Sequence, residues 1–121
     1  MLKKVSIIVP IYNAERFLAS TLDSLVNQSL HDIDIICIND GSTDRSLEIC
    51  EQFKADYPEI IRIFTKPNGG KASALNFGIQ HTNAEYVVCI DADTKLYPNA
   101  VSLMMLHFLD KSSNEDRKSV V

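Results

Sequence analysis

Four runs of apolar residues divide the chain at nearly regular intervals. They cover Val5 to Val9, Ile33 to Ile38, Ile60 to Phe64 and Tyr86 to Ile90, and they are rich in isoleucine and valine. Apolar residues follow one another in these runs instead of alternating with polar ones, which is typical of strands that are buried on both faces. The pattern therefore predicts four strands of a parallel sheet.

The segments between these runs repeat apolar residues at helical spacing. The repeats are Leu18, Leu22 and Leu25, then Leu47, Cys50, Phe53 and Tyr57, then Ala72, Leu75 and Ile79. We expect Asn13 to cap the first helix, Ser42 or Thr43 to cap the second, and Pro98 to open a fourth. Strands that alternate with helices predict an α/β, Rossmann-like parallel sheet in the order 3-2-1-4, with helices on both faces and a switch point between strands 1 and 4.

The fourth predicted helix, Ala100 to Leu109, is apolar on almost every side. Such a helix needs partners on two faces, and the sheet covers only one of them. We therefore expect either further protein beyond this sequence or a second copy of the chain, a homo-oligomer, against the other face. Residues 1–109 are predicted to form one domain. The polar residues 110–121 are predicted to be a poorly ordered tail or a truncation point.

Composition narrows the class of protein. The chain has 121 residues and a formal net charge of -4, and no run of basic residues is longer than Lys3-Lys4, which argues against nucleic-acid binding. Its cysteines, Cys37, Cys50 and Cys89, are far apart and fit reduced thiols in a cytoplasmic protein. The run Val5 to Ile11 is too short to span a membrane, so we expect membrane contact only through parts outside this sequence.

Asp91 and Asp93 follow directly after the last predicted strand, with one residue between them. Side chains two residues apart on an extended chain point the same way, so both carboxylates can face one hard divalent cation. Ligands of open α/β sheets bind outside the carboxyl ends of the strands, which places this pair at the functional edge. Asp32 and Asp34 have the same spacing but precede a strand, and we predict a solvated turn for them at the opposite edge.

The strand order brings the ends of the first, second and fourth strands to one edge. With neighbouring strands ~4.8 Å apart, the second and fourth ends lie ~10 Å apart, about the reach from a nucleobase to its diphosphate. Asp40 can accept a hydrogen bond from the N–H of a base such as uracil, without a charge partner. Asp91 and Asp93 can hold Mg²⁺ or Mn²⁺ on the diphosphate. The segment Gly69-Gly70-Lys71 opens the third helix, where free N–H groups and a cation can face an anion.

Taken together, these motifs resemble the GT-A fold glycosyltransferases of family 2. The matching pieces are Val5 to Asn13, Ile38 to Asp44, Asn68 to Gly78, and Asp91 to Asp93. The resemblance implies transfer of a sugar from a nucleotide-sugar, a UDP-sugar by expectation, to a saccharide or other acceptor. It also implies dependence on Mn²⁺ or Mg²⁺ and, commonly, inversion at the anomeric carbon.

The resemblance also implies roles for individual residues. Pro10, Tyr12 and Glu15 would line the nucleoside pocket, Asp40 would contact the base, Lys71 would lie near the nucleotide, Asp91 would neighbour the ribose and diphosphate, and Asp93 would ligate the metal. Leu75 stands where many non-processive members carry arginine, which resembles the polymer-making branch. Members of the family place their catalytic base after the metal motif, in a part that this sequence does not include. We therefore expect the 121 residues alone to bind the donor poorly and to transfer no sugar.

Two other functions remain open from the sequence. Asp91-Ala92-Asp93-Thr94 matches the opening motif of haloacid-dehalogenase phosphatases, in which the first aspartate is a nucleophile, although there the motif follows the first strand. A non-catalytic nucleotide-binding domain is the second alternative. A dinucleotide-binding domain is disfavoured, because no Gly-x-Gly-x-x-Gly segment follows the first strand.

Overall fold

The computed structural model describes residues 4–111 and 118–120 as alternating strands and helices. The strands are β1 (Val5–Ile11), β2 (Ile33–Asp40), β3 (Ile61–Lys66), β4 (Tyr86–Cys89) and β5 (Lys118–Val120). The helices are α1 (Glu15–Val26), α2 (Ser46–Asp56), α3 (Lys71–Gln80) and α4 (Ala100–Lys111). The four predicted strands are confirmed within two residues at each end.

All strands lie parallel in one sheet of order β3-β2-β1-β4-β5. The predicted order 3-2-1-4 is confirmed, and β1 lies between β2 and β4, with Ile7 opposite Ile35 on one side and Val88 on the other. The short strand β5 was not predicted. It falls in the predicted polar tail, of which residues 112–117 and 121 lie outside the described residues.

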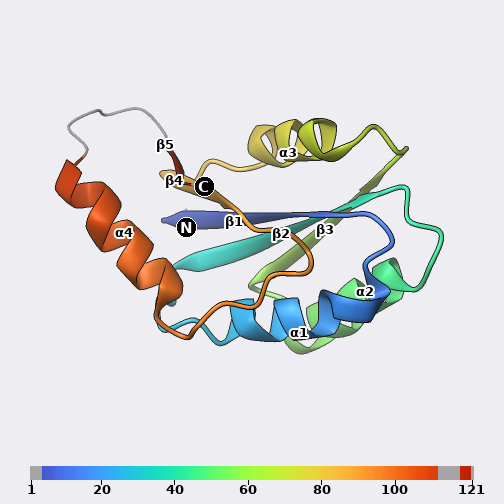
Figure 1. Cartoon of the computed structure of the whole chain (residues 1–121), viewed down its shortest axis with the longest axis horizontal. Coiled ribbons are helices and arrows are strands. Elements are labelled where there is room, and N and C mark those ends of the chain that lie inside the picture. Colours follow the sequence, from blue (N-terminus) through green and yellow to red (C-terminus); the bar gives the residue numbers. More distant parts are fainter. Residues whose placement is uncertain (1–3, 112–117, 121) are drawn as a thin grey trace.

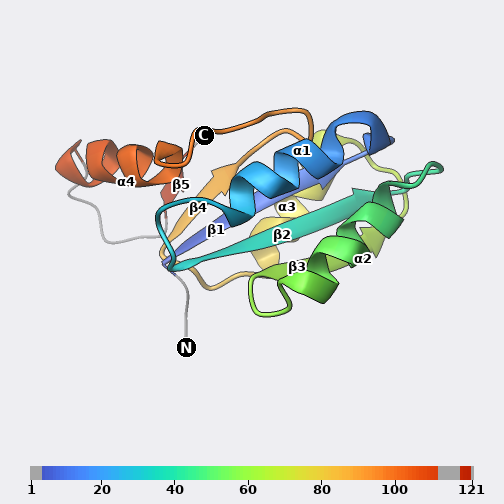
Figure 2. The same ribbon diagram turned by 90° about the horizontal axis from the view of Figure 1, so that it is seen from below.

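Helices cover both faces of the sheet, as predicted (Figures 1 and 2). The odd-numbered residues of β1 belong to one apolar cluster with residues of α1, α2 and α4, whereas Ile8 belongs to a second cluster with residues of α3. Alternate side chains of a strand point to opposite faces, so the continuous apolar runs of β1 and β2 supply both clusters.

The first helix confirms the predicted apolar repeat but not the predicted cap. Leu18, Leu22 and Leu25 are fully buried against the sheet. Asn13 does not cap α1: the cap position is Ala14, without a side-chain cap bond. The prediction of Ser42 or Thr43 as the cap of α2 is wrong as well, because that helix begins at Ser46 after Arg45.

The third helix faces the sheet with other residues than predicted. Ala74 and Gly78 are its buried residues, whereas Ala72 is exposed and Leu75 and Ile79 are only partly buried. Leu75 and Ile79 still pack against the cluster of Ile8 and Ala74, so the prediction is wrong for Ala72 and holds in part for the other two residues. Small residues at the contact let the helix backbone approach the sheet closely, and a Cβ built at Gly78 would lie 2.7 Å from Cγ2 of Ile8.

We expect Gly78→Ala to destabilise the fold, because this added methyl group overlaps Ile8. Overpacking of a core lowers the free energy of unfolding by about 1–3 kcal/mol. The better helix propensity of alanine offsets up to about 1 kcal/mol of this loss. Urea unfolding followed by circular dichroism measures the difference. Asn76→Ala, at an exposed position of the same helix, is the matched control and is expected to lose no stability. Equal or higher stability of Gly78→Ala would show that the contact relaxes freely.

The predicted solvated turn at Asp32 and Asp34 is correct only for Asp32, which is exposed. Asp34 lies in β2, is 7% exposed, and accepts a hydrogen bond from the hydroxyl of Ser6 on the neighbouring strand. Arg62 on β3 adds an ion pair to Asp34 at 3.5 Å. The carboxylate is buried because partners on two adjacent strands replace water.

The fourth helix is covered on one side only within the described residues. Val101 and Met105 are buried in the cluster with α1, whereas Leu103 and Leu106 are 55% and 69% exposed. The side chain of Gln28, at the end of α1, accepts the N–H of Val101 at 2.9 Å and fixes the start of the helix. Association of two copies through α4 stays a prediction. The described helices include no segment with the length and hydropathy needed to cross a membrane.

Candidate functional site

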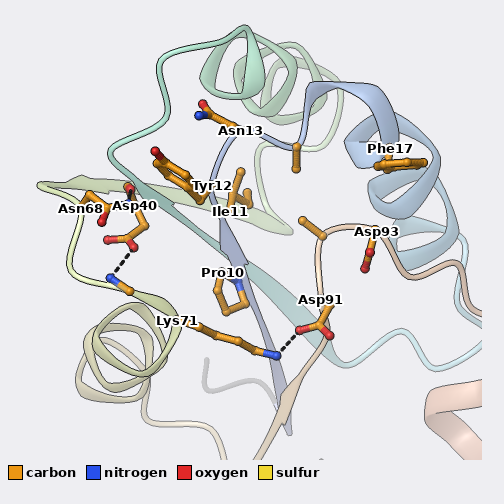
Figure 3. A pocket seen from close by; sticks show the side chains of 13 residues that line it. Pro10, Ile11, Tyr12, Asn13, Phe17, Asp40, Asn68, Lys71, Asp91 and Asp93 are labelled. Carbon is orange, nitrogen blue, oxygen red and sulfur yellow. Dashed lines mark hydrogen bonds and ion pairs between the residues drawn. The ribbon is translucent and has the colours of Figure 1, made fainter.

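A pocket of about 700 Å³ opens where β1, β2 and β4 end (Figure 3). Its lining residues are Pro10, Ile11, Tyr12, Asn13, Ala14, Phe17, Asp40, Asn68, Gly70, Lys71, Asp91, Ala92 and Asp93. Of the predicted site residues, the structure thus gathers Pro10, Tyr12, Asp40, Lys71, Asp91 and Asp93 around one cavity. Glu15 is not among the lining residues and stands at the first position of α1.

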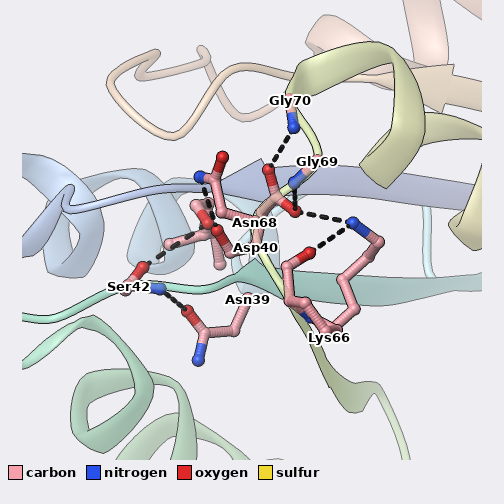
Figure 4. Close-up of polar contacts among 9 residues, drawn as sticks. Asn39, Asp40, Ser42, Lys66, Asn68, Gly69 and Gly70 are labelled. Atoms are coloured by element: carbon pink, nitrogen blue, oxygen red, sulfur yellow. Dashed lines mark hydrogen bonds and ion pairs between the residues drawn. The ribbon is translucent and has the colours of Figure 1, made fainter.

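Asp40, the last residue of β2, accepts three hydrogen bonds through its carboxylate (Figure 4). Its Oδ1 accepts Lys66 Nζ at 2.8 Å and the N–H of Gly69 at 3.0 Å, and its Oδ2 accepts the N–H of Gly70 at 2.9 Å. The side chain of Asn68 donates to the carbonyl oxygen of Asp40 at 3.0 Å. One carboxylate therefore holds the segment between β3 and α3 against the end of β2.

These contacts correct two predictions. Asp40 does have a charge partner, Lys66, whose side chain is only 14% exposed. The N–H groups of Gly69 and Gly70 are not free for an external anion, because Asp40 is itself the anion that they bind. A carboxylate offers about four acceptor positions, of which three are used. Asp40 can accept one further hydrogen bond, on Oδ2.

The pKa of Asp40 is lowered from its ordinary value. Burial acts to raise this pKa, but the hydrogen bonds from Lys66, Gly69 and Gly70, with the charge of Lys66, together outweigh it. Asp40 is therefore ionised at neutral pH, and its remaining acceptor position suits a neutral N–H donor.

Asp91 and Lys71 form an ion pair across the mouth of the pocket (Figure 3). Both side chains are more than half exposed, at 53% and 61%. The hydrogen bond to Asp91 raises the pKa of Lys71. Lys71 thus places a cation beside the carboxylate pair. The sequence suggested that Lys71 faces an anion, and in the structure that anion is Asp91.

Asp91 and Asp93 follow β4, as predicted, but they lie in a turn and not on an extended chain. The N–H of Thr94 donates to the carbonyl oxygen of Asp91 at 3.0 Å, and the buried hydroxyl of Thr21 on α1 donates to that of Ala92 at 2.7 Å. Both aspartates still line the pocket, because the turn keeps Ala92 buried between them.

This donor set fits a hard divalent cation bound together with a ligand. No group of three or more His, Cys, Asp or Glu side chains placed to hold a metal occurs within residues 4–111 and 118–120 as described. Mg²⁺ usually takes one or two carboxylates and completes its shell with substrate phosphates and water. Asp91 and Asp93, both exposed to the pocket, supply the oxygen ligands that such a cation needs from the protein.

Phe17 and Lys66 are among the residues of this region that sequence reasoning did not assign to the site. Phe17, in the first turns of α1, lines the pocket and is 49% exposed, with the guanidinium of Arg16 5.5 Å from its ring. Lys66 does not line the pocket but holds Asp40. Helical spacing flagged only the buried face of α1, and nothing local to Lys66 indicates a partner 26 residues earlier in the chain.

The profile of glycosyl transferase family 2 matches residues 6–114, most of the chain. The chain belongs to this family. Hyaluronan synthase of Pasteurella multocida is 39% identical over 105 residues, which are 87% of this chain and 11% of that protein. Family membership disfavours the haloacid-dehalogenase alternative, and so does the position of the Asp-x-Asp segment, which follows the fourth strand of this chain and not the first.

Solved structures support the GT-A fold of this family 2 member. TarS of S. aureus, in complex with UDP-GlcNAc, has a TM-score of 0.79 and 26% identity, over 89% of this chain and 31% of that one. A mannosyltransferase of Pyrobaculum calidifontis, in complex with GDP-Man and Mn²⁺, has a TM-score of 0.75 and 27% identity, over 85% of this chain and 31% of that one. The chain thus spans less than a third of the length of each of these relatives.

Proposed function

We propose that this chain is the donor-binding part of a glycosyltransferase that uses a UDP-sugar. The observation that carries the proposal is one pocket with two chemically different ends (Figure 3). Asp40, with one acceptor position left, suits the N–H of uracil at one end. Asp91, Asp93 and Lys71 suit a diphosphate with its cation at the other. TarS, bound to UDP-GlcNAc, supports the choice of nucleotide.

In this proposal Asp91 and Asp93 hold Mn²⁺ or Mg²⁺. The bound cation would neutralise charge on the diphosphate leaving group. Lys71 exchanges its contact with Asp91 for a phosphate oxygen, which keeps a positive charge beside the leaving group. Pro10 and Tyr12 form the wall for the nucleoside. Glu15 does not line the pocket, so it contacts the nucleoside only if the loop before α1 moves. The mannosyltransferase bound to Mn²⁺ supports the choice of metal.

The proposed reaction is sugar transfer to a saccharide acceptor with inversion, on the cytoplasmic side of the cell. Inversion requires a base that activates the acceptor hydroxyl. The pocket carboxylates Asp40 and Asp91 are paired with lysines, and Asp93 is assigned to the metal. We therefore assign the base to the remainder of the longer relatives' transferase domain, and we expect the 121 residues alone to transfer no sugar. The likeness to hyaluronan synthase supports a polymer as product.

Titration calorimetry with UDP, with and without Mn²⁺, tests the proposed function. We expect UDP to bind more tightly in the presence of Mn²⁺, because the cation links the diphosphate to Asp91 and Asp93. CDP is the matched control, since cytosine offers an acceptor in place of the N3–H of uracil, and it should bind more weakly than UDP. Binding of neither nucleotide, or equal binding of both, would contradict the proposal.

A further inference from the structure

The carboxylate of Asp44 lies between the first turns of two helices. Its Oδ1 accepts the N–H of Ser46, the first residue of α2, at 2.9 Å, and its Oδ2 accepts the N–H of Glu15, the first residue of α1, at 3.1 Å. Helix N-termini carry unpaired N–H groups and partial positive charge, so one anion satisfies both helices. Burial acts to raise the pKa of Asp44, but the hydrogen bonds from Ser46 and Glu15 outweigh it and lower the pKa.

Asn13 connects the same two loops from the other side. Its Oδ1 accepts the N–H groups of Thr43 at 2.7 Å and Asp44 at 3.3 Å, and its own N–H donates to Ser42 Oγ at 3.0 Å. Its φ of 49° lies in the left-handed region, which asparagine adopts more readily than most residues. We call the hydrogen bonds between residues 11–15 and residues 42–46 the latch.

The latch fixes the backbone on both sides of Tyr12. Ser42 Oγ reaches the carbonyl oxygen of Ile11 at 3.5 Å, and the N–H of Ala14 donates to Ser46 Oγ at 2.9 Å. Tyr12 itself is 56% exposed and lines the pocket, so its ring has little packing of its own to hold it in place. The direction of this ring therefore depends on the backbone that carries it.

We propose that Asp44 and Asn13 are positioning residues, which hold Tyr12 through the latch as the nucleoside wall of the pocket. The inference rests on the proposed function, because it assigns the wall to a UDP-sugar. Asp44 is not one of the described lining residues, so its effect on binding passes through the latch. The polar segment after β2 was predicted only to cap α2. In this proposal it also holds the backbone beside Tyr12, through its hydrogen bonds to Asn13 and to the start of α1.

Asp44→Ala is expected to weaken uridine, UMP and UDP by the same factor, about tenfold, comparable with the loss of a helix cap converted to affinity. The factor should not depend on Mn²⁺, because the nucleoside end is affected and not the diphosphate end. Calorimetry well below the unfolding temperature measures it. Glu48→Ala is the matched control: it removes an acidic residue of the first turn of α2 whose ion pair with Arg45 is not one of the latch hydrogen bonds, and it should leave affinity unchanged.

A double-mutant cycle with Tyr12→Ala separates positioning from general destabilisation. If Asp44 acts through Tyr12, Asp44→Ala should lose no further UDP affinity once Tyr12 is alanine. Asn13→Gly is the second probe of the latch, since glycine adopts a φ of 49° freely but cannot accept the N–H of Thr43 or Asp44. Because Asn13 itself lines the pocket, this variant tests the latch through amide exchange, and it should speed exchange of the Thr43 and Asp44 amides.

Amide hydrogen exchange tests the latch without any ligand. Asp44→Ala should speed exchange of the Glu15 and Ser46 amides and leave those of β1 protected. Unchanged exchange or affinity, or the same loss in both Tyr12 backgrounds, would overturn the inference. Failure of the unmodified chain to bind UDP would overturn the proposed function, whereas normal UDP binding with an inert Asp44→Ala would overturn only the positioning role.

Discussion

Asp40→Ala is expected to remove about 3–5 kcal/mol from the free energy of unfolding, the usual cost of breaking a buried ion pair. The substitution leaves the ammonium of Lys66 with its side chain 14% exposed and unpaired, and it leaves the N–H groups of Gly69 and Gly70 without their acceptor. UDP affinity should fall with it, because Asp40 and the start of α3 both belong to the pocket wall. Urea unfolding measures the first effect and calorimetry the second.

A surface ion pair supplies the control for Asp40. Arg45 and Glu48 approach to 2.7 Å but are 71% and 50% exposed, so Glu48→Ala should cost little or nothing. The double variant Asp40→Ala with Lys66→Met should recover part of the stability, because it no longer buries an unpaired charge. A loss for Asp40→Ala no larger than that for Glu48→Ala would show that the carboxylate does not hold the loop.

Stability should also depend on pH through Asp40. Its pKa is lowered in the folded state by hydrogen bonds from Lys66, Gly69 and Gly70 that outweigh burial. The contribution of Asp40 is therefore fully present above the unfolded-state pKa of about 3.9 and is lost as pH falls through the lower folded-state pKa. The stability advantage of the unmodified chain over Asp40→Asn should thus shrink in acid and stay constant from about pH 5 to 7.

The fold was predictable where burial and chain direction leave few choices. Continuous apolar runs identify β1 and β2, which are buried on both faces, and right-handed crossovers leave few orders of four strands, of which 3-2-1-4 is observed. Periodicity indicated Leu75 and Ile79, which pack at the edge of the contact between α3 and the sheet, but not its buried centre, because Ala74 and Gly78 are small. The strand β5 has a mostly polar sequence of three residues and carries no such signal.

The site was predictable in location but not in its internal pairing. Strand ends after apolar runs place Asp40, Asp91 and Asp93 at one edge, and the structure gathers all three around one pocket. Whether a carboxylate meets a ligand or a lysine depends on the reach of distant side chains. Lys66 and Lys71, both contributed by the β3–α3 region, take up Asp40 and Asp91, and no local pattern announces either contact. The predicted cap of α1 was wrong because a distant side chain again makes the contact. Asp44, in the loop after β2, accepts the N–H of Glu15 at the start of α1.

Asp93→Ala is expected to abolish the part of UDP affinity that depends on Mn²⁺. Within the described part of the chain, Asp93 forms no ion pair. Its carboxylate is therefore available to a cation without displacing a lysine. Asp91, by contrast, must first release Lys71. Removing Asp93 should therefore weaken UDP by at least about tenfold in Mn²⁺, equivalent to about 1.4 kcal/mol, and leave uridine unaffected. Calorimetry with both ligands measures the split.

Asp32→Ala is the matched control, because Asp32 belongs to a segment of the same spacing at the opposite edge of the sheet and is exposed. It should change neither ligand. Lys71→Gln gives the complementary result: it frees Asp91 for the cation, so Mn²⁺ alone should bind more tightly, while UDP loses a positive neighbour of its phosphates. If Asp93→Ala weakened uridine as much as UDP, the carboxylate would shape the nucleoside wall, and the two ends of the pocket would not be chemically separate.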